Sequence, residues 1–209
     1  TIRQQNIYGK HVKNCYQLPV DVAHPESEWY INRTLNEAIN LAQSSVKGPV
    51  HVNVPLREPL YPNQDSPFAY SKVRIIHRSN TYHKVLPTEW EQIKEEYNHS
   101  SNKLLVLGQQ SYSQEFIKEL KAFVESSGIV LVADTVSNAH FLKPDFVRHH
   151  DLFLPLLGTK QLEKMKPDLV ITMGGSLVSK PLKIFLRKYK PAFHWHVTEG
   201  DNAPDTFRA

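Results

Sequence analysis

The segment Gly174-Gly175-Ser176, followed by Ser179 and Lys180, combines residue types that bind anions. A glycine-containing turn between a strand and a helix offers backbone N–H groups beside the positive end of the helix dipole. Lys180 would begin that helix, where a basic side chain is electrostatically disfavoured unless an anion lies nearby. The spacing is not a G-x-G-x-x-G dinucleotide motif, and a tight turn that needs small residues is the alternative explanation of the glycines. We therefore predict an anion contact at Lys180.

The other polar residues do not assemble a complete catalytic site. Asp134 and Asp168 lie near predicted strand ends, where carboxylates act in acid–base chemistry but also cap helices and turns. The histidines that could bind metal come in pairs without a third ligand at a useful spacing, namely His149-His150 and His194-x-His196. The sequence contains neither a G-x-S-x-G nucleophile motif nor a phosphate-binding P-loop. We predict no catalytic residue, no metal ligand and no cofactor-binding residue within this chain.

Strands that alternate with helices would bring the candidate loops to one edge of a sheet. Apolar runs predict strands at 104–107, 129–133, 169–173 and 193–197. Amphipathic stretches predict helices at 114–127 and 180–188, with a helical turn at 162–165. Nearly continuous apolar strands indicate a parallel sheet covered on both faces, a Rossmann-like α/β fold. Ligands approach the carboxyl ends of such strands, so loops 108–113, 134–138 and 174–180 form the predicted contact surface.

Helix ends are predicted from capping residues. Ser113 is the expected N-cap of the helix that follows it, and Gly128 is expected to end that helix. Thr88 is the expected N-cap of a helix at 89–97, with Glu91 at the third helical position.

The first third of the chain is predicted to form the C-terminal part of another α/β domain. Apolar residues at helical spacing indicate a helix at 32–42, and Gly48-Pro49 ends it. Alternation of Val50, Val52 and Val54 then predicts a strand. From residue 64 the periodicity is lost and proline, serine and basic residues accumulate, which indicates a linker.

Several motifs occur in the same order as in thiamine-diphosphate-dependent enzymes. They are Thr1-Ile2-Arg3-Gln4, Gly48-Pro49-Val50-His51-Val52-Asn53-Val54-Pro55, Glu58-Pro59-Leu60-Tyr61 and Gly174-Gly175-Ser176-Leu177-Val178-Ser179-Lys180. Together they resemble the 2-succinyl-5-enolpyruvyl-6-hydroxy-3-cyclohexene-1-carboxylate synthase family of menaquinone biosynthesis. The resemblance covers most of the chain and is weakest from Gln64 to Asn102.

The resemblance implies that the chain is part of a longer enzyme. Residues 1–63 would be the C-terminal part of the pyrimidine-binding domain, 64–100 a linker and lead-in helix, and 101–209 the central Rossmann-like domain, truncated at its end. The family's cofactor-activating glutamate and its G-D-G motif for magnesium and diphosphate are not in this sequence. Thiamine diphosphate with Mg²⁺ (or Mn²⁺) is therefore expected in the full-length parent. We expect no cofactor on this segment, which by itself should be inactive.

The resemblance also implies a reaction and its partners. The family decarboxylates 2-oxoglutarate and adds the succinyl unit to isochorismate, and both of these small substrates are anionic. In the family a basic pair in the 174–180 loop contacts substrate carboxylates; Lys180 matches its first position, whereas Pro181 takes the second. Lys180 and Ser179 are thus the predicted substrate-binding residues, and a homodimer or homotetramer is expected for the full-length parent.

Charge and composition are compatible with this expectation. A net charge of +4 favours anionic partners, but the basic residues are dispersed and lack the motifs of nucleic-acid-binding domains, so we expect no nucleic acid. No run of about 18 apolar residues and no signal-peptide pattern occurs, so we expect a cytoplasmic protein without membrane contact. With one cysteine, Cys15, an internal disulfide is impossible.

Two alternatives stay open. The parent could be another thiamine-diphosphate-dependent 2-oxo acid enzyme, such as an acetohydroxyacid-synthase-like protein whose central domain binds a flavin or nucleotide. The chain could instead be a non-catalytic Rossmann-like module that binds an anionic metabolite. The cofactor glutamate upstream and G-D-G downstream in the parent gene would distinguish an enzyme from a module.

Overall fold

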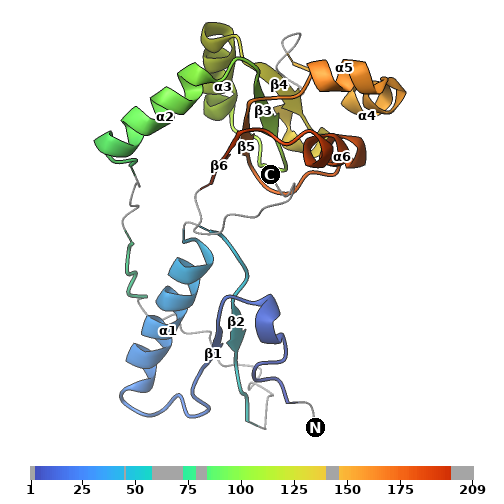
Figure 1. The fold of residues 1–209 in the computed structure, drawn as a ribbon. Helices are drawn as coiled ribbons and strands as arrows, with labels where there is room; N and C mark the ends of the chain where they lie inside the picture. Colours follow the sequence, from blue (N-terminus) through green and yellow to red (C-terminus); the bar gives the residue numbers. More distant parts are fainter. Residues whose placement is uncertain (1–2, 45, 58–72, 79–83, 140–145, 199–209) are drawn as a thin grey trace. The chain divides into compact units, whose positions relative to one another are not determined.

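The computed structural model describes residues 3–44, 46–57, 73–78, 84–139 and 146–198 (Figure 1). The chain divides into two compact units, residues 1–83 and 84–209. Each unit is described by itself below.

The first unit is a helix on a short parallel sheet. Strand β1 (Cys15–Gln17) pairs in parallel with β2 (His51–Asn53), and helix α1 (Ser27–Ala42) lies between them in the chain. A turn of 3-10 helix, Gly9–His11, precedes β1. Strand β2 and helix α1 confirm the predicted strand and helix, although α1 begins five residues earlier than expected at Ser27. Sequence analysis missed β1, because three residues without apolar alternation carry no strand signal until a partner strand is known.

Helix α1 also binds the segment 73–78 of the first unit through asparagine side chains. The Asn36 side chain accepts a hydrogen bond from the Ile76 N–H (2.7 Å) and donates one to the Arg74 carbonyl (2.8 Å). One turn away on either side, Asn32 accepts from the Arg74 N–H (3.3 Å) and Asn40 donates to the Ile76 carbonyl (3.0 Å). Residues spaced by four lie on one face of a helix, so these asparagines form a ladder that pairs with peptide backbone.

The second unit contains a four-stranded parallel sheet with the order β4-β3-β5-β6. Its elements, in chain order, are α2 (Pro87–His99), β3 (Lys103–Leu107), α3 (Gln114–Ser127), β4 (Val130–Ala133), α4 (His150–Phe153), α5 (Thr159–Lys164), β5 (Leu169–Met173), α6 (Lys180–Lys188) and β6 (Phe193–Val197). Short 3-10 turns occur at Thr135–Ser137 and Leu154–Leu156. The predicted α/β class with a parallel sheet flanked by helices is confirmed.

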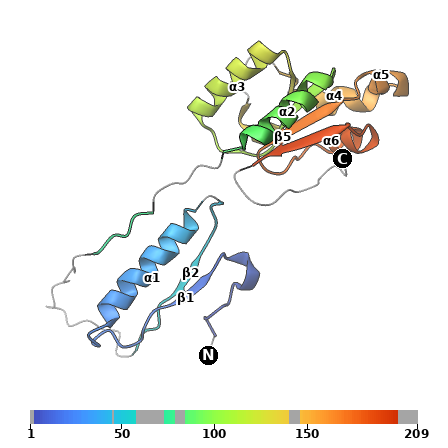
Figure 2. The ribbon, with the colours of Figure 1, turned by 60° about the vertical axis from the view of Figure 1, so that its left-hand side comes forward.

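Helices cover both faces of this sheet (Figures 1 and 2), and an apolar layer packs against each face. On one face Leu105, Leu107 and Leu131 pack against side chains of α2 and α3, including Tyr97 and Leu120. On the other face, Val106, Val132 and Val170 pack against α4 and α6; the helical members include Leu182, Phe185 and Leu186. Burial on both faces explains why the strands are almost continuously apolar in sequence.

The helix ends follow local chemistry. Ser113 caps α3 by accepting a hydrogen bond from the Phe116 N–H (3.3 Å), and Gly128 ends the helix with a positive φ of 64°, so both predictions are confirmed. The predicted N-cap Thr88 is wrong, because α2 begins at Pro87 after the extended residue Leu86. Proline has no N–H to satisfy and favours the first helical position, which places Glu89 rather than Glu91 third. The Glu89 carboxylate accepts from the Leu86 N–H (3.2 Å).

Candidate functional site

The three predicted loops leave the carboxyl ends of β3, β4 and β5, neighbouring strands of one sheet. The chain passes from β3 outward to β4 and then returns to the opposite side of β3 to form β5. The point between β3 and β5 is therefore the topological switch point, which is where open α/β sheets bind ligands. The loops after β3 and β5 flank this point.

Backbone contacts join these two loops. The Gly175 N–H donates to the Gln109 carbonyl (2.7 Å), and the Gln109 N–H donates to the Ser176 carbonyl (3.2 Å). A Cβ atom at Gly108 would collide with the Gly175 carbonyl oxygen, so glycine is required by the close approach of the two backbones. At least one N–H of the Gly174-Gly175-Ser176 turn is thus used inside the protein rather than being available for an external anion.

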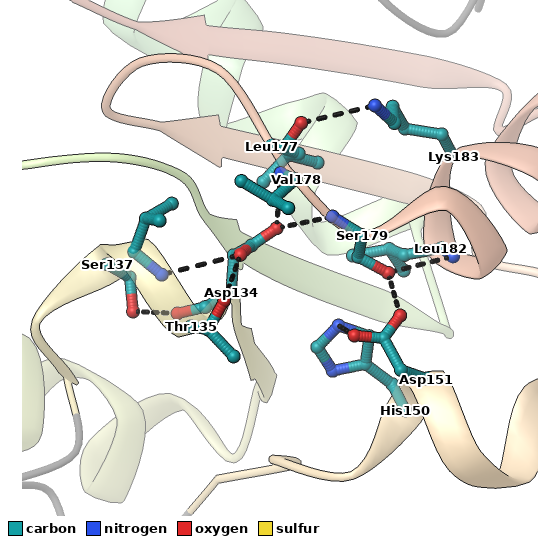
Figure 3. Close-up of polar contacts among 11 residues, drawn as sticks. Asp134, Thr135, Ser137, His150, Asp151, Leu177, Val178, Ser179, Leu182 and Lys183 are labelled. Atoms are coloured by element: carbon teal, nitrogen blue, oxygen red, sulfur yellow. Dashed lines mark hydrogen bonds and ion pairs between the residues drawn. The ribbon is translucent and has the colours of Figure 1, made fainter.

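Asp134, directly after β4, is the centre of the polar contacts at this edge (Figure 3). One carboxylate oxygen accepts from the backbone N–H groups of Val178 (2.7 Å) and Ser179 (2.9 Å). The other accepts from the Thr135 hydroxyl (3.1 Å) and, more weakly, from the Val136 N–H (3.4 Å). The side chain is buried. Asp134 therefore satisfies donors at the start of α6 and holds the loops after β4 and β5 together.

These contacts determine the charge state of Asp134. Burial raises the pKa of Asp134. Hydrogen bonds from the Ser179, Val178 and Val136 N–H groups and from the Thr135 hydroxyl lower this pKa, and together they outweigh burial. The net result is a pKa below the ordinary value of 3.8. Asp134 is thus a carboxylate at neutral pH, and its oxygens are already engaged. Of the two roles that the sequence left open for Asp134, the geometry fits the turn and cap.

Ser179, a predicted substrate-binding residue, is the buried N-cap of α6. Its hydroxyl oxygen accepts from the Leu182 N–H (3.2 Å) and donates its proton to a carboxylate oxygen of Asp151 in α4 (Figure 3). The hydroxyl thus links α4 to α6. Asp151 was not singled out from sequence, because its partner lies 28 residues away and no spacing rule connects them.

Lys180, the other predicted substrate-binding residue, is the exposed first residue of α6. The sequence argument required an anion near this helix start, and the carboxylates of Asp134 and Asp151 supply negative charge there. The neighbouring Lys183 ammonium donates to the Leu177 carbonyl (3.2 Å). Lys180 forms no ion pair with any residue in the described ranges, so its charge is available to solvent and ligands.

The remaining sequence candidates have structural roles. One oxygen of Asp168 accepts from the Ser101 (2.9 Å) and Asn102 (2.8 Å) N–H groups at the amino end of the sheet. His194 and His196 share one face of β6, as predicted. The Thr172 hydroxyl lies 3.0 Å from Nε2 of His194 and 2.8 Å from Nδ1 of His196.

Two findings concern only the described part of the chain. No group of three or more His, Cys, Asp or Glu side chains there is arranged to hold a metal ion. Within the same residues, no helix has the length and apolar character needed to cross a membrane. The motif residues Thr1, Ile2 and Glu58-Pro59-Leu60-Tyr61 lie outside the described ranges.

The fold places the second unit among open α/β proteins with a ligand-binding edge at the carboxyl ends of the strands. Comparison with curated proteins shows that the whole chain is homologous to part of 2-succinyl-5-enolpyruvyl-6-hydroxy-3-cyclohexene-1-carboxylate synthases. The synthase of Cytophaga hutchinsonii is 36% identical over 208 residues, covering 100% of this chain and 36% of the relative. Those of Bacteroides fragilis (32% over 216 residues) and Flavobacterium johnsoniae (33% over 210 residues) have the same coverage.

The chain thus spans 36% of the length of these curated relatives. No protein-family model matches it. Among solved structures, a proposed thiamin diphosphate-dependent enzyme from Mycobacterium smegmatis aligns with 93% of this chain and 32% of its own, at a TM-score of 0.47 and 17% identity.

Proposed function

We propose that this chain is part of a thiamine-diphosphate-dependent synthase that decarboxylates 2-oxoglutarate and adds the succinyl unit to isochorismate in menaquinone biosynthesis. The observation that carries the proposal is homology over the whole of this chain to part of a synthase of that name, at 36% identity. In this proposal residues 1–63 form the C-terminal part of the pyrimidine-binding domain, residues 64–100 form a linker and lead-in helix, and residues 101–209 form most of the central domain. The full-length parent would be a cytoplasmic homodimer or homotetramer, and the isolated chain would be inactive.

The cofactor would be held outside this chain. Thiamine diphosphate, with Mg²⁺ or Mn²⁺, supplies the electron sink for decarboxylation when it is bound. The described residues contain no cluster of potential ligands for such a metal. The contribution proposed for this chain is to orient and neutralise an anionic substrate.

Lys180 would make that contribution. Its ammonium group is exposed at the carboxyl edge of the sheet, and Ser179 fixes its backbone by capping α6. Asp134 fixes the same turn through the Ser179 N–H. A lysine whose backbone is held by two neighbours delivers a charge at a defined position while its flexible side chain adapts to the substrate carboxylate. Ser179 then acts by positioning Lys180, since its hydroxyl is used inside the protein.

The reaction is tested by assaying the full-length parent with thiamine diphosphate, magnesium, 2-oxoglutarate and isochorismate. Consumption of isochorismate that depends on both cofactor and 2-oxoglutarate is the expected result. A folded, cofactor-loaded protein that leaves isochorismate unchanged would contradict the proposal. Turnover of another 2-oxo acid would then indicate a different enzyme of the superfamily, and failure to bind the cofactor would indicate a non-catalytic module.

The role of Lys180 predicts the effect of Lys180→Ala. Loss of one charge-assisted contact costs about 1.5–3 kcal/mol, so kcat/KM for the acid substrate should fall roughly 10- to 100-fold. Lys190→Ala is the matched control, because Lys190 is also exposed but follows α6 rather than beginning it. Unchanged kinetics for both acids in Lys180→Ala would rule out the contact.

A further inference from the structure

The segment 73–78 runs beside α1 (Figure 1) and is bound to it along one edge. The backbone groups of Arg74 and Ile76 bond to the asparagine ladder. Four residues of helix rise about 6 Å, and two residues of an extended chain advance about 6.6 Å, so every second residue of the segment meets the next asparagine. This match requires an extended segment, in which alternate residues direct their N–H and C=O groups to opposite sides. The segment is therefore paired like a strand, with α1 in place of one neighbouring strand.

The opposite edge of the segment is exposed. Between Arg74 and Ile76, the Ile75 N–H and C=O groups point away from α1, and neither forms a hydrogen bond with a described residue. The backbone groups of Val73 and His77 face the same way and are also without a hydrogen bond to the described part of the chain. Val73 and Ile75 are 65% and 66% exposed. An unpaired edge with β-branched residues is a template for pairing with another extended chain.

A groove lies between the segment and α1. It consists of two adjoining hollows of about 470 and 400 Å³, both lined by Arg33, Asn36 and Ile76. Arg74 lines the first hollow and Arg78 lines the second, whereas the odd-numbered residues of the segment line neither. The even-numbered side chains therefore share one face of the segment, as they do in a strand. An added strand would thus meet arginines on one face and exposed apolar side chains on the other.

The charges along this groove favour an acidic partner. The segment 73–78 contains no acidic residue, and Arg74 and Arg78 form no ion pair with a described residue. Glu28 and Glu37 also line the groove, but its three arginines outnumber them. A second copy of the same segment would gather the arginines of both copies, and like charges on neighbouring strands are destabilising. The chain that fits this edge is therefore an acidic one.

From this geometry we propose that the segment 73–78 is a docking site for an extended acidic segment of a partner protein, which adds to the free edge as a strand. Hydrogen bonds to the backbone of Val73, Ile75 and His77 hold the partner chain. Every second side chain of the partner packs beside Val73 and Ile75, and the acidic side chains between them meet the arginines of the groove. The site lies in the first unit and does not depend on the function proposed above.

Two adjacent isoleucines report on the two edges of the segment. The Ile76 N–H donates to Asn36 (2.7 Å), whereas the Ile75 N–H faces outward. In the full-length protein labelled with ¹⁵N-isoleucine, with signals assigned by Ile75→Val and Ile76→Val, the Ile75 amide should exchange with solvent at least about fivefold faster than that of Ile76. An Ile75 amide as protected as that of Ile76 would show that the parent chain already covers this edge. Protection that grows with protein concentration would show that a second copy covers it, and either result overturns the proposal.

The probe is the capped pentapeptide Val-Glu-Val-Glu-Val, whose central valine lies opposite Ile75 in the proposed pairing. Binding should shift the Ile75 amide signal and slow its exchange while the Ile76 amide changes little, with a Kd of about 1 mM or below. Two matched peptides separate the contributions. Val-Lys-Val-Lys-Val reverses the charge, and N-methylation of the central valine removes its N–H donor, so both should bind at least about tenfold more weakly.

Variants of the protein test the same contacts, with binding followed by saturation transfer to the valine methyl groups of the peptide. Ile75→Pro removes the outward N–H and keeps the two N–H groups that bond to α1, so it should weaken binding at least about tenfold while the Ile76 amide stays protected. Arg74→Glu should weaken binding of the acidic peptide and strengthen that of the lysine peptide. Arg57→Glu, a change at an exposed position outside the groove, should affect neither.

Three further results would overturn the proposal. They are an Ile75 signal that about 10 mM acidic peptide leaves unmoved, a lysine peptide that binds as well as the acidic one, and an Ile75→Pro variant that binds as well as wild type.

Discussion

At the scale of single residues, Asp134 determines the geometry of the carboxyl edge. Its two oxygens accept from groups in two loops that are more than 40 positions apart in sequence. An aspartate after a buried strand is open to a catalytic interpretation, but a carboxylate whose oxygens are already engaged by donors is a poor proton acceptor. The same contacts that lower its pKa therefore make it a structural anion for the start of α6.

The substitution Asp134→Asn should destabilise the second unit. If the asparagine oxygen accepts from the Val178 and Ser179 N–H groups, its NH2 group faces the Thr135 hydroxyl and the Val136 N–H, so the Val136 N–H loses its acceptor. The negative charge that strengthens the other hydrogen bonds is lost as well. The expected loss is about 1.5–3 kcal/mol in the free energy of unfolding, measured by urea denaturation at neutral pH. Glu163→Gln, which removes the same charge from an exposed position on α5, should change stability by less than about 0.5 kcal/mol. Equal stability of Asp134→Asn and wild type would contradict this role.

The same contacts predict the direction of pH dependence. Because the pKa of Asp134 is lower in the folded protein than in the unfolded chain, ionised Asp134 stabilises the fold fully above about pH 3.8. This contribution is lost as the pH falls through the lower, folded-state pKa. The stability difference between wild type and Asp134→Asn should therefore narrow below about pH 3.8, which denaturation at several acidic pH values would show.

At the scale of elements, the asparagine ladder on α1 fixes the segment 73–78. The ladder uses side-chain amides in the manner of a neighbouring strand, since Asn36 both donates to and accepts from the same backbone. Because the asparagines bind backbone groups of the segment, they hold it whatever its side chains are. Helix α1 therefore organises both its own sheet and the chain that leaves the unit.

Loss of the ladder should expose the segment to protease. Asn36→Leu removes the two hydrogen bonds from this side chain to the segment, each contributing about 1 kcal/mol, so trypsin cleavage after Arg74 should become at least about tenfold faster. Asn98→Leu makes the same change on the exposed surface of α2 and should leave that rate unchanged. The cleavage site is identified by mass spectrometry of early products. An unchanged rate at Arg74 in Asn36→Leu would show that other contacts hold the segment.

At the scale of the whole molecule, the contacts of Asp134 and of Asn36 each lie within a single compact unit. Substitutions that share no partner contribute independently to stability, generally within about 0.5 kcal/mol. In hydrogen-exchange measurements on the described residues, Asp134→Asn should therefore increase exchange in residues 84–198, and Asn36→Leu should increase it in residues 3–78. The two effects should add in the double variant. Coupling above about 1 kcal/mol would show that the two units are linked energetically.

The sequence by itself determined the α/β class, β3, β5, β6 and α6, and the capping of α3. These features depend on local rules: apolar strand runs, the lack of a Cβ atom at Gly128 and the hydroxyl of Ser113 act within a few residues of their own position. The order of the sequence motifs likewise predicted the homology to these synthases. The start of α2 was predicted wrongly because Pro87 outweighed the capping preference of Thr88.

Only the tertiary structure decided how the candidate residues are used. The exposed Lys180 and the buried Ser179 are adjacent in sequence, yet their different roles follow from Asp134 and Asp151, which reach α6 from other elements. Strand β1 and the asparagine ladder are equally invisible in sequence, because each depends on partners far apart in the chain. Local patterns fix elements, whereas the partners of a buried polar group are fixed only when the elements have packed.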